Sequence, residues 1–464
     1  FLVETMKKID ISAFSKRDRA DLGGRTEYNP KTILAILFYG ISEGVFSSVK
    51  ISESCLYDVR YIFISGGETP EHSTISRFIN NYFEEIEDVF IKILYIADGL
   101  GYLDYKLLAT DGSKFKAYAS ERFTGTIEDF KKRKTKLEIK IKLALEKQKN
   151  TDSDEERNYW KNKEDDYRKD KSKIEDFLES ADKIYNKNNK EIKQNITDKD
   201  CRVMKGKKQE IAESYNSQIT VDEKHNLITA CDVTNECNDF NMLVDMVEIN
   251  TKMIPDSKKE VFKESKLVFD NGYYTTDNLN YCDENDIDAY ICDDRSTYIY
   301  TDKKNEDYFL KKKKITSRDC KIRLNNGELF LTCPNNKELK FVEKQKDRET
   351  YNYRYKTKYL HDCCECKYKS KCVNQRTGEK IFSIRANLIE NADLIDKMHK
   401  KLRTESGRMI YSRRMPTVER LFGHVKKNLR FDRFSVIGLN KVRTRWSMIC
   451  SAYNLKRIYK LSYS

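Results

Sequence analysis

The stretch YNSQITVDEKHNLITACDVT, residues 215–234, alternates apolar and polar residues on both sides of the polar segment DEKHN. Alternation with a period of two is typical of β-strands, and a short polar segment between two such runs is typical of a hairpin. The stretch therefore predicts two strands joined by a hairpin. We take this hairpin as the starting point for the predicted core.

Predicted strands and helices alternate on both sides of the hairpin. The segment KLLATDGSKFKAYA, residues 106–119, predicts a strand that enters a turn at Asp111–Gly112. After the hairpin, the pattern predicts a helix at 240–250, an apolar strand at 266–270, a helix at 276–285 and a buried strand at 288–292. The order strand, strand, strand, helix, strand, helix, strand predicts an α/β core with mixed strand directions.

The composition argues against several classes of protein. The chain has 464 residues, of which 39% are hydrophobic and 35% charged, so we expect about two to four domains with real cores. No apolar run is long enough to cross a membrane, and no signal-peptide pattern stands near the start, although a chain that begins at Phe1 leaves a removed leader open. Thirteen cysteines in a chain of this length do not indicate a secreted disulfide scaffold, and a reducing cytoplasm is expected.

Residues 127–190 differ in composition from the rest of the chain. They contain 35 charged residues in 64, with no Gly and no Pro, which predicts long helices with a break near Asn150–Asp154. The expected form is an antiparallel helical hairpin. Because 19 positive and 16 negative charges nearly cancel, an arm used for spacing or self-association is favoured over a DNA contact.

The positive charge is concentrated at the C-terminal end. Residues 397–464 hold 18 Lys or Arg against 3 Asp or Glu, a net charge of +15, whereas the whole chain carries +13. A local basic excess indicates a polyanion partner, although a solvated helix face is the alternative. Cations interleaved with aromatic residues favour nucleic acid, with the aromatic rings packing or stacking: Arg430, Phe431, Arg433, Phe434, Arg443, Arg445 and Trp446.

Three carboxylates stand out by position. Asp111 ends the first predicted strand, Asp270 ends the fourth, and Glu419 lies in the first turn of a basic helix that starts at Pro416. Carboxylates held close repel one another and need a cation, and oxygen ligands suit Mg²⁺ or Mn²⁺. Two such ions can activate a water or a 3′-hydroxyl and stabilise the leaving oxygen of a phosphodiester.

The residues around Glu419 strengthen this interpretation. Steps of three or four residues place Gly423, Lys426 and Arg430 on the same helical face, opposite an apolar face. One face would then offer a metal ligand, a glycine that permits close approach and two cations for phosphates. An ordinary amphipathic surface helix explains the apolar face but not the residues opposite it.

Several stretches together resemble a known family, the bacterial insertion-sequence transposases of the Asp-Asp-Glu type with an RNase H-like catalytic domain. The stretches that carry the resemblance are GRTEYNPKTILAILFYGISEGVFSSVKISE, TPEHSTISRF, LLATDGSKFKAYAS, DKDCRVMKG, ESYNSQITVD, DVTNECND, VFDNGYYTTDNL and TVERLFGHVKKNLRFDRFSVIGLNKVRTRWSMICSAYNL. They cover most of the chain apart from the charged arm, and their order makes the resemblance specific.

The resemblance implies a division of the chain around an α/β fold with an RNase H-like mixed-sheet core. The implied parts are an N-terminal all-α DNA-binding domain at 1–100, the core at 101–126 and 197–294, an inserted helical arm at 127–196, an inserted Cys-rich subdomain at 295–395 and the C-terminal core helices with a basic face at 396–464. Within 1–100, short helices around Gly66–Gly67 suit a helix-turn-helix-like module, and a plain helical bundle is the alternative.

The resemblance also implies roles for individual residues. Asp111, Asp270 and Glu419 would be catalytic ligands of two Mg²⁺ or Mn²⁺ ions, and Lys426 matches the family's lysine seven positions after the glutamate. Tyr411 and Arg414 are candidates for the tyrosine and arginine that precede it, with spacing that departs by one residue from the commonest pattern. The further DNA-binding candidates are Lys427, Arg430, Arg433, Arg77 and Thr74.

The implied function is DNA transposition. The protein would bind the terminal inverted repeats of its element, cut the DNA ends and join them to target DNA, as a homodimer on double-stranded DNA at the bacterial nucleoid. Two alternatives remain: an RNase H-like nuclease without strand transfer, and a catalytically silent DNA-binding descendant of a transposase.

Five cysteines cluster between residues 333 and 372. The spacing Cys363-x₂-Cys366, with Cys333 and Cys372, predicts a tetrahedral thiolate site for a structural Zn²⁺, which would help to fold a segment too polar for a large core. Cys364 and His361 are substitutes in this set. The alternatives are reduced buried thiols and disulfides.

Overall fold

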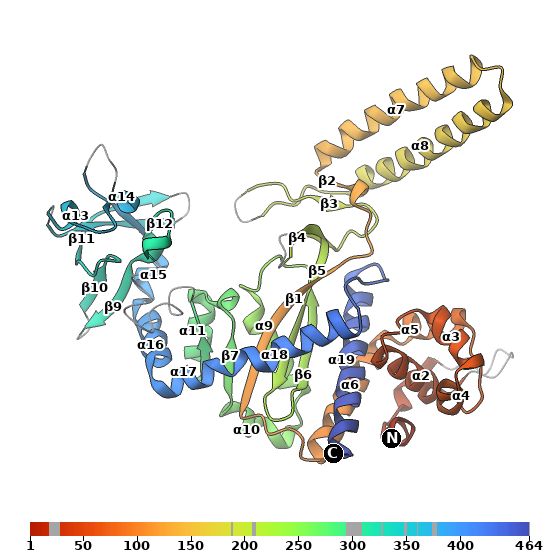
Figure 1. Cartoon of the computed structure of the whole chain (residues 1–464), viewed down its shortest axis with the longest axis horizontal. Coiled ribbons are helices and arrows are strands. Elements are labelled where there is room, and N and C mark those ends of the chain that lie inside the picture. Colours follow the sequence, from red (N-terminus) through yellow and green to blue (C-terminus); the bar gives the residue numbers. More distant parts are fainter. Residues whose placement is uncertain are drawn as a thin grey trace.

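The computed structural model describes the chain except for residues 18–27, 187–188, 207–209, 294–308, 326–327, 348–349, 360, 374–377 and 464. At its centre is a mixed sheet, which in the described residues has six strands (Figure 1). The strands are β1 (Leu107–Lys116), β4 (Arg202–Lys205), β5 (Ile211–Asp222), β6 (Leu227–Thr234), β7 (Lys266–Phe269) and β8 (Ala289–Ile291). Their order is β4-β5-β1-β7-β8, with β6 also paired to β5.

The strand directions confirm the predicted mixed α/β core. β5 is antiparallel to β1, β4 and β6, whereas β7 is parallel to β1 and β8 is parallel to β7. The predicted hairpin corresponds to β5 and β6. Helices precede both β7 and β8 in the chain, as expected for strands that lie parallel to a neighbour in the sheet.

β1 is longer than predicted, and Asp111 lies in its middle rather than at its end. The strand continues to Lys116, because β5 pairs with it from Leu108 to Lys116. Asp-Gly is a common turn pair, but here the twelve residues of β5 keep the backbone extended. Asp270, by contrast, follows β7 directly, as predicted.

Helices cover both faces of the sheet. On one side lie α9 (Met242–Met253), η4 (Asp256–Lys258), α10 (Lys259–Lys263), η5 (Asn271–Tyr273) and α11 (Thr276–Glu284). The C-terminal part supplies α16 (Ala392–Arg403), α17 (Glu405–Ser412), α18 (Arg414–Gly423), the π-helical turn η8 (His424–Asn428) and α19 (Leu439–Ser462). In Figure 1, α17 and α18 run across the sheet toward α19.

The basic helix starts earlier than predicted. α17 ends at Ser412, and α18 begins two residues later at Arg414. Pro416 therefore lies in the first turn of α18 and Glu419 in the second. A proline within the first turn is tolerated because that turn has no intrahelical acceptor for its N–H. Helix α18 is therefore the continuation of a helical path that starts at α16.

The N-terminal part is helical, as predicted. It contains α1 (Leu2–Lys8), η1 (Ser12–Arg17), α2 (Pro30–Ser42), α3 (Ser48–Tyr57), α4 (Val59–Ser65), α5 (His72–Asn81) and α6 (Phe83–Gly99). Pro30 begins α2, and the Asn29 side chain accepts a hydrogen bond from Lys31 N. One buried apolar cluster contains residues of these helices, of the sheet and of α19. The helical part is therefore packed against the core.

Trp446 ties the sheet to the C-terminal helix, and we expect its removal to cost stability. Its side chain is fully buried, its ring centroid lies 5.1 Å from that of Phe115, and its Nε1 donates to Gln218 O at 3.1 Å. We expect Trp446→Ala to lower the free energy of unfolding by about 3–5 kcal/mol. Urea unfolding would measure the loss. Leu56→Ala, at an exposed position, is the control and should change it by less than about 0.5 kcal/mol.

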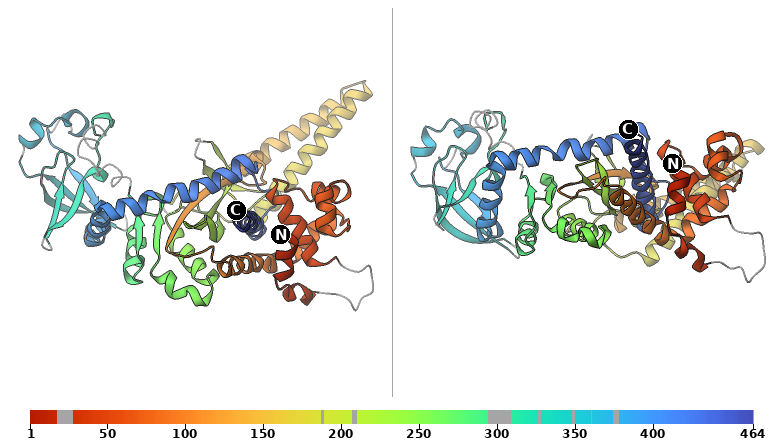
Figure 2. Two further views of the ribbon diagram at one scale, coloured as in Figure 1. Left: turned by 60° about the horizontal axis from the view of Figure 1, so that its bottom comes forward. Right: turned by 90° about the horizontal axis from the view of Figure 1, so that it is seen from below.

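The charged stretch forms two antiparallel helices, which project from the sheet in Figures 1 and 2. α7 (Ile127–Lys149) and α8 (Asp154–Ser180) are separated at the predicted break, and η3 (Glu121–Phe123), β2 (Thr124–Gly125) and β3 (Gln194–Asn195) form the base. A small buried cluster at the base contains Phe130 and Phe177. Farther out, ion pairs join the two helices, with 2.9 Å between Lys134 Nζ and Glu175 Oε1 and 3.2 Å between Lys171 Nζ and Glu138 Oε1.

The Cys-rich part lies at the opposite end of the molecule from the N-terminal helices (Figure 2). Its elements are η7 (Ser317–Asp319), β9 (Lys321–Asn325), β10 (Glu328–Thr332), β11 (Leu339–Asp347), β12 (Thr350–Thr357), α13 (His361–Cys364), α14 (Lys369–Cys372), β13 (Phe382–Arg385) and α15 (Ala386–Glu390). It has a small apolar cluster of its own. Its first residues, 295–308, lie outside the described residues, so the predicted boundary at 295 stays a prediction.

In the described part of the chain, no helix combines the length and apolar character that crossing a membrane requires.

Candidate active site

Asp111 and Asp270 lie on either side of one guanidinium group. Arg414 Nη1 is 3.6 Å from Asp111 Oδ2, and Arg414 Nη2 is 3.6 Å from Asp270 Oδ1. The two aspartates come from adjacent parallel strands, and Arg414 comes from the start of α18. The structure therefore brings together two of the three predicted carboxylates, with a cation between them.

Backbone amides hold both carboxylates in place. Gly112 N donates to Asp111 Oδ1 at 2.8 Å, and Asn271 N donates to Asp270 Oδ1 at 2.7 Å. Asp270 is the N-cap of η5, so its carboxylate accepts from an otherwise unpaired amide. In Asp111, Oδ1 is therefore held by the next amide and Oδ2 faces Arg414, whereas in Asp270 the same oxygen, Oδ1, accepts from the next amide and faces Arg414.

The groups at this site shift one another's pKa. Burial alone would lower the pKa of the Arg414 guanidinium, but Asp270, Asp111 and Tyr411 beside it raise that pKa above its ordinary value. Burial raises the pKa of the Tyr411 phenol, and the nearby Cys292 and Asp270 raise it further. Tyr411 and Arg414, chosen by resemblance, therefore lie beside the two aspartates. Arg414 Nη1 is buried and makes no hydrogen bond within the described residues.

Glu419 is not part of this group. It is exposed on α18, five residues after Arg414, which turns it by about 140° around the helix axis from Arg414. In the described ranges, no three or more His, Cys, Asp or Glu side chains are arranged to hold a metal ion. The structure thus places Asp111 and Asp270 together and Glu419 apart on the same helix that carries Arg414.

Lys426 points toward the sheet rather than into solvent. Its Nζ donates to Ser113 Oγ at 2.7 Å and to Lys114 O at 2.9 Å, and it lies 4.5 Å from the centroid of the Phe115 ring. Ser113 is two residues after Asp111, so both side chains lie on the same face of β1. The π-helical turn changes the predicted helical face, and Arg430 lies beyond it with a φ of 55°.

The predicted DNA contacts differ in exposure. Lys427, Arg430, Arg433 and Arg77 are exposed, and Thr74 is half-buried on α5. The predicted stacking residues Phe431, Phe434 and Trp446 are instead buried in the core, and so is Arg445, whose pKa burial lowers to about 10. Arg443 Nε donates to Val233 O at 3.1 Å and lies 2.9 Å from Asp232 Oδ1. Of the two roles expected for these aromatic rings, packing or stacking, the structure shows packing, because all three rings lie against Phe115 of β1.

Four cysteines of the Cys-rich part share one cavity. Cys333, Cys363, Cys366 and Cys372 line a cavity of about 20 Å³, whereas Cys364 is exposed. Burial raises the pKa of the Cys372 thiol to about 12, against the opposing effect of Lys380, and the other three thiols raise it further. All thirteen cysteines, each within the described ranges, are free thiols, so the disulfide alternative is not observed. His361 is exposed and lies outside the residues that line this cavity.

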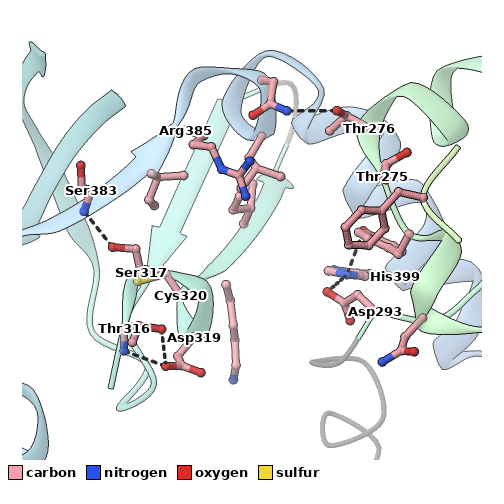
Figure 3. A pocket seen from close by; sticks show the side chains of 18 of the residues that line it. Thr275, Thr276, Asp293, Thr316, Ser317, Asp319, Cys320, Ser383, Arg385 and His399 are labelled. Atoms are coloured by element: carbon pink, nitrogen blue, oxygen red, sulfur yellow. Dashed lines mark hydrogen bonds and ion pairs between the residues drawn. The ribbon is translucent and has the colours of Figure 1, made fainter. Parts of the chain in front are cut away.

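A larger cavity lies between the core and the Cys-rich part. It has a volume of about 930 Å³ and its lining includes Asn271, the residue after Asp270. Figure 3 shows Thr275, Thr276 and His399 on one side, with Ser317, Asp319, Ser383 and Arg385 on the other. His399 Nε2 lies 3.2 Å from Asp293 Oδ2. The segment that carries Asp270 and the Cys-rich part therefore line the same cavity.

The sequence alone did not single out Asp239, which lies in the loop between β6 and α9. Its Oδ1 accepts hydrogen bonds from Asn216 Nδ2 at 2.8 Å and from Gln218 Nε2 at 2.6 Å. Asp239 was contained in the stretch DVTNECND, which carried only the general resemblance. The sequence signal that points to Asp239 is the presence of two polar residues, Asn216 and Gln218, in the buried strand β5.

The order and directions of the strands, with aspartates on the two adjacent strands β1 and β7, define the class of RNase H-like catalytic cores. Two family models match the chain: "Transposase DDE domain" over residues 332–459, and "Transposase domain (DUF772)" over residues 1–81. Together these matches indicate an insertion-sequence transposase of the DDE type. No curated protein and no solved structure matches the chain.

The matched ranges contain some of the candidate site residues and not others. The DDE-domain match includes the four cavity cysteines, Arg414, Glu419 and Lys426, whereas Asp111 and Asp270 precede it. The family suggests a metal-dependent enzyme that cuts DNA, with DNA as its substrate. These matches assign no role to an individual residue.

Proposed function

We propose that this protein is a DNA transposase that binds the terminal inverted repeats of its insertion sequence, cuts the DNA ends and joins them to target DNA. The observation that carries the proposal is the meeting of Asp111 and Asp270 at Arg414. A pair of carboxylates on adjacent parallel strands is the arrangement that a shared divalent cation needs. The family matches make DNA the substrate, and the bacterial nucleoid is the expected place of action.

The donor set fits Mg²⁺ or Mn²⁺, because it consists of carboxylate oxygens. Asp111 and Asp270 would hold the ions from the sheet, whereas Glu419, the third expected ligand, lies apart from them on α18. When bound, two ions would activate the attacking water or 3′-hydroxyl and stabilise the leaving oxygen. Arg414 offsets part of the negative charge of the two aspartates, and its buried Nη1 would donate to a phosphate oxygen of the DNA. Lys426 would place a fixed positive charge on the same face of β1.

The exposed cations would bind the DNA backbone. Lys427, Arg430 and Arg433 follow one another around the end of the π-helical turn, and Arg77 and Thr74 lie on α5. Contacts of this kind release counterions, so binding should weaken steeply as salt rises. They fix the position of the DNA without reading its sequence.

Incubating the full chain with labelled DNA that carries the element's terminal repeats and Mg²⁺ or Mn²⁺ tests the proposal. We expect cleavage at the repeat ends and joining of 3′ ends to a second DNA. Cleavage without joining would favour the nuclease alternative. Salt-sensitive binding without any cleavage would favour the silent descendant.

We also propose that the arm formed by α7 and α8 helps two protomers assemble on paired DNA ends. Glu138 and Lys171 form an ion pair across the arm, so a Gly-rich turn joining them in place of residues 139–170 would keep the buried base. We expect this shortened protein to keep its melting temperature and its single-end binding. Paired-end assembly, measured by light scattering with end DNA, should weaken by roughly 10²-fold. Unchanged assembly would contradict this role.

We further propose that Cys333, Cys363, Cys366 and Cys372 hold a structural Zn²⁺. Support comes from four thiols that line one small cavity, since four thiolates are a common structural zinc set, although these thiols, all within the described ranges, do not form a metal-binding arrangement. The apolar cluster of this part is small, so a bound ion would add much of its folding free energy.

A further inference from the structure

A chain of buried polar groups lies behind the active site. Neighbouring strand residues point to opposite faces, so Asp111 and Ser113 share the face on which Lys426 lies, and Gly112 is on the other. On that other face, Tyr273 OH donates to Gln218 Oε1, Gln218 Nε2 donates to Asp239 Oδ1, and Asn216 Nδ2 donates to the same oxygen. Tyr273, Gln218 and Asn216 are almost completely buried.

The carboxylate of Asp239 touches the backbone next to both catalytic candidates. A Cβ at Gly112 would overlap Gln218 Nε2 and lie 2.7 Å from Asp239 Oδ1. A Cβ at Gly272 would lie 3.1 Å from Asp239 Oδ2. Gly112 follows Asp111, and Gly272 is two residues after Asp270. Asp239 therefore lies close to both segments that carry the aspartates, with no room for a Cβ at position 112 and a tight fit for one at position 272.

We propose that Asp239 is a positioning residue that, with Asn216, Gln218 and Tyr273, fixes the separation of Asp111 and Asp270 so that they can share a divalent cation. This inference rests on the proposed function, because it concerns the same metal site. Asp239 itself acts through its neighbours and does not touch the ion.

The direction of the hydrogen bonds supports this role. The Tyr273 hydroxyl donates to Gln218 Oε1, because an amide oxygen can only accept. Gln218 must then accept with its oxygen and donate with its nitrogen, which leaves Asp239 as the final acceptor. A fully satisfied buried network of this kind specifies one arrangement, and a network that loses one member becomes costly. Loss of Asp239 would leave Gln218 Nε2 without this acceptor and Asn216 Nδ2 with the longer bond to Glu236 O at 3.3 Å.

The test compares Asp239→Ala with Asp239→Asn in the full chain. An asparagine oxygen can still accept from both amides, whereas alanine cannot. We expect Asp239→Ala to raise the Mn²⁺ concentration for half-maximal DNA cleavage by roughly 10- to 100-fold, as outer-shell changes do. Asp239→Asn should stay close to wild type. Glu236→Gln, an exposed neighbour that also loses one negative charge, is the matched control.

A second pair of variants tests the close approach. Gly112→Ala should raise the Mn²⁺ requirement as Asp239→Ala does, because its Cβ would displace Gln218 and Asp239. Gly99→Ala, with no atom within 4 Å of the added Cβ, should not. Melting temperatures of all variants separate a local shift of the site from unfolding.

The outcomes separate the possible failures. An unchanged Mn²⁺ requirement in Asp239→Ala with a native melting temperature would overturn the inference. So would Asp239→Asn as damaged as Asp239→Ala, because the carboxylate would then meet the ion directly. If the wild-type protein cuts no DNA, the proposed function fails. Calorimetric Mn²⁺ binding to the DNA-free protein still compares Asp239→Ala with wild type, and equal affinities there would overturn the positioning role on its own.

Discussion

Asp270→Asn is expected to lower DNA cleavage by on the order of 10³-fold or more, equivalent to about 4 kcal/mol of transition-state stabilisation. The substitution removes one of the two negative charges that meet at Arg414 and keeps the size of the side chain. The asparagine oxygen can still accept from Asn271 N, so η5 should keep its cap. The loss should therefore appear in metal-dependent chemistry and not in the melting temperature.

The measurement is a single-turnover cleavage assay on terminal-repeat DNA with Mg²⁺ and with Mn²⁺. Asp256→Asn is the matched control, because the Asp256 side chain is 92% exposed and forms an ion pair with Lys259, the first residue of α10. DNA binding by both variants should remain similar to wild type. Full cleavage by Asp270→Asn would show that the ion is bound elsewhere.

The position of Arg414 follows from the charges around it. Two carboxylates held close repel each other unless a positive charge lies between them, and Arg414 supplies that charge. A divalent ion between the same carboxylates would take over this role and free the guanidinium for a DNA phosphate. The start of α18 at Arg414 also makes the position of Glu419 depend on how Arg414 is held.

The order of strands and helices in the core could be predicted from the sequence, because apolar alternation and short apolar runs are local signals. The proximity of Asp111 and Asp270 could also be predicted, since these residues stand on or next to strands that were recognised. The position of Asp111 within β1 could not, because Asp-Gly favours a turn and only the pairing with β5 keeps it extended. Local propensity gives way here to a long-range contact.

Two other differences between the sequence-based expectation and the structure also arise from long-range contacts. Arg445 and Trp446 looked like a nucleic acid surface, but α19 is surrounded by α6, α2 and the sheet, so composition did not show which side is buried. Asp239 was overlooked because its importance lies in contacts with Gly112 and Gly272, which are far away in the sequence. Such contacts become visible only when the strands are paired.

Cys363→Ser is expected to remove bound zinc and to unfold the Cys-rich part at ordinary temperature. Structural zinc sites contribute about 10–16 kcal/mol of apparent binding free energy at neutral pH, which far exceeds what one small apolar cluster can supply. Serine is close in size to cysteine but is a poor zinc ligand, so the change isolates ligation from packing. The purified wild-type chain should hold about one zinc per chain by elemental analysis.

Cys364→Ser provides the matched control, because Cys364 is the next residue in α13 yet exposed, whereas Cys363 is buried and lines the cavity. We expect Cys364→Ser to keep its zinc and its resistance to limited proteolysis, and Cys363→Ser to lose both between residues 309 and 395. Treating the wild type with a strong chelator should reproduce the Cys363→Ser digestion pattern. A wild-type protein without zinc, or equal zinc in the two serine variants, would contradict a zinc site at this cavity, and the four thiols would then be reduced side chains that are buried or half-buried.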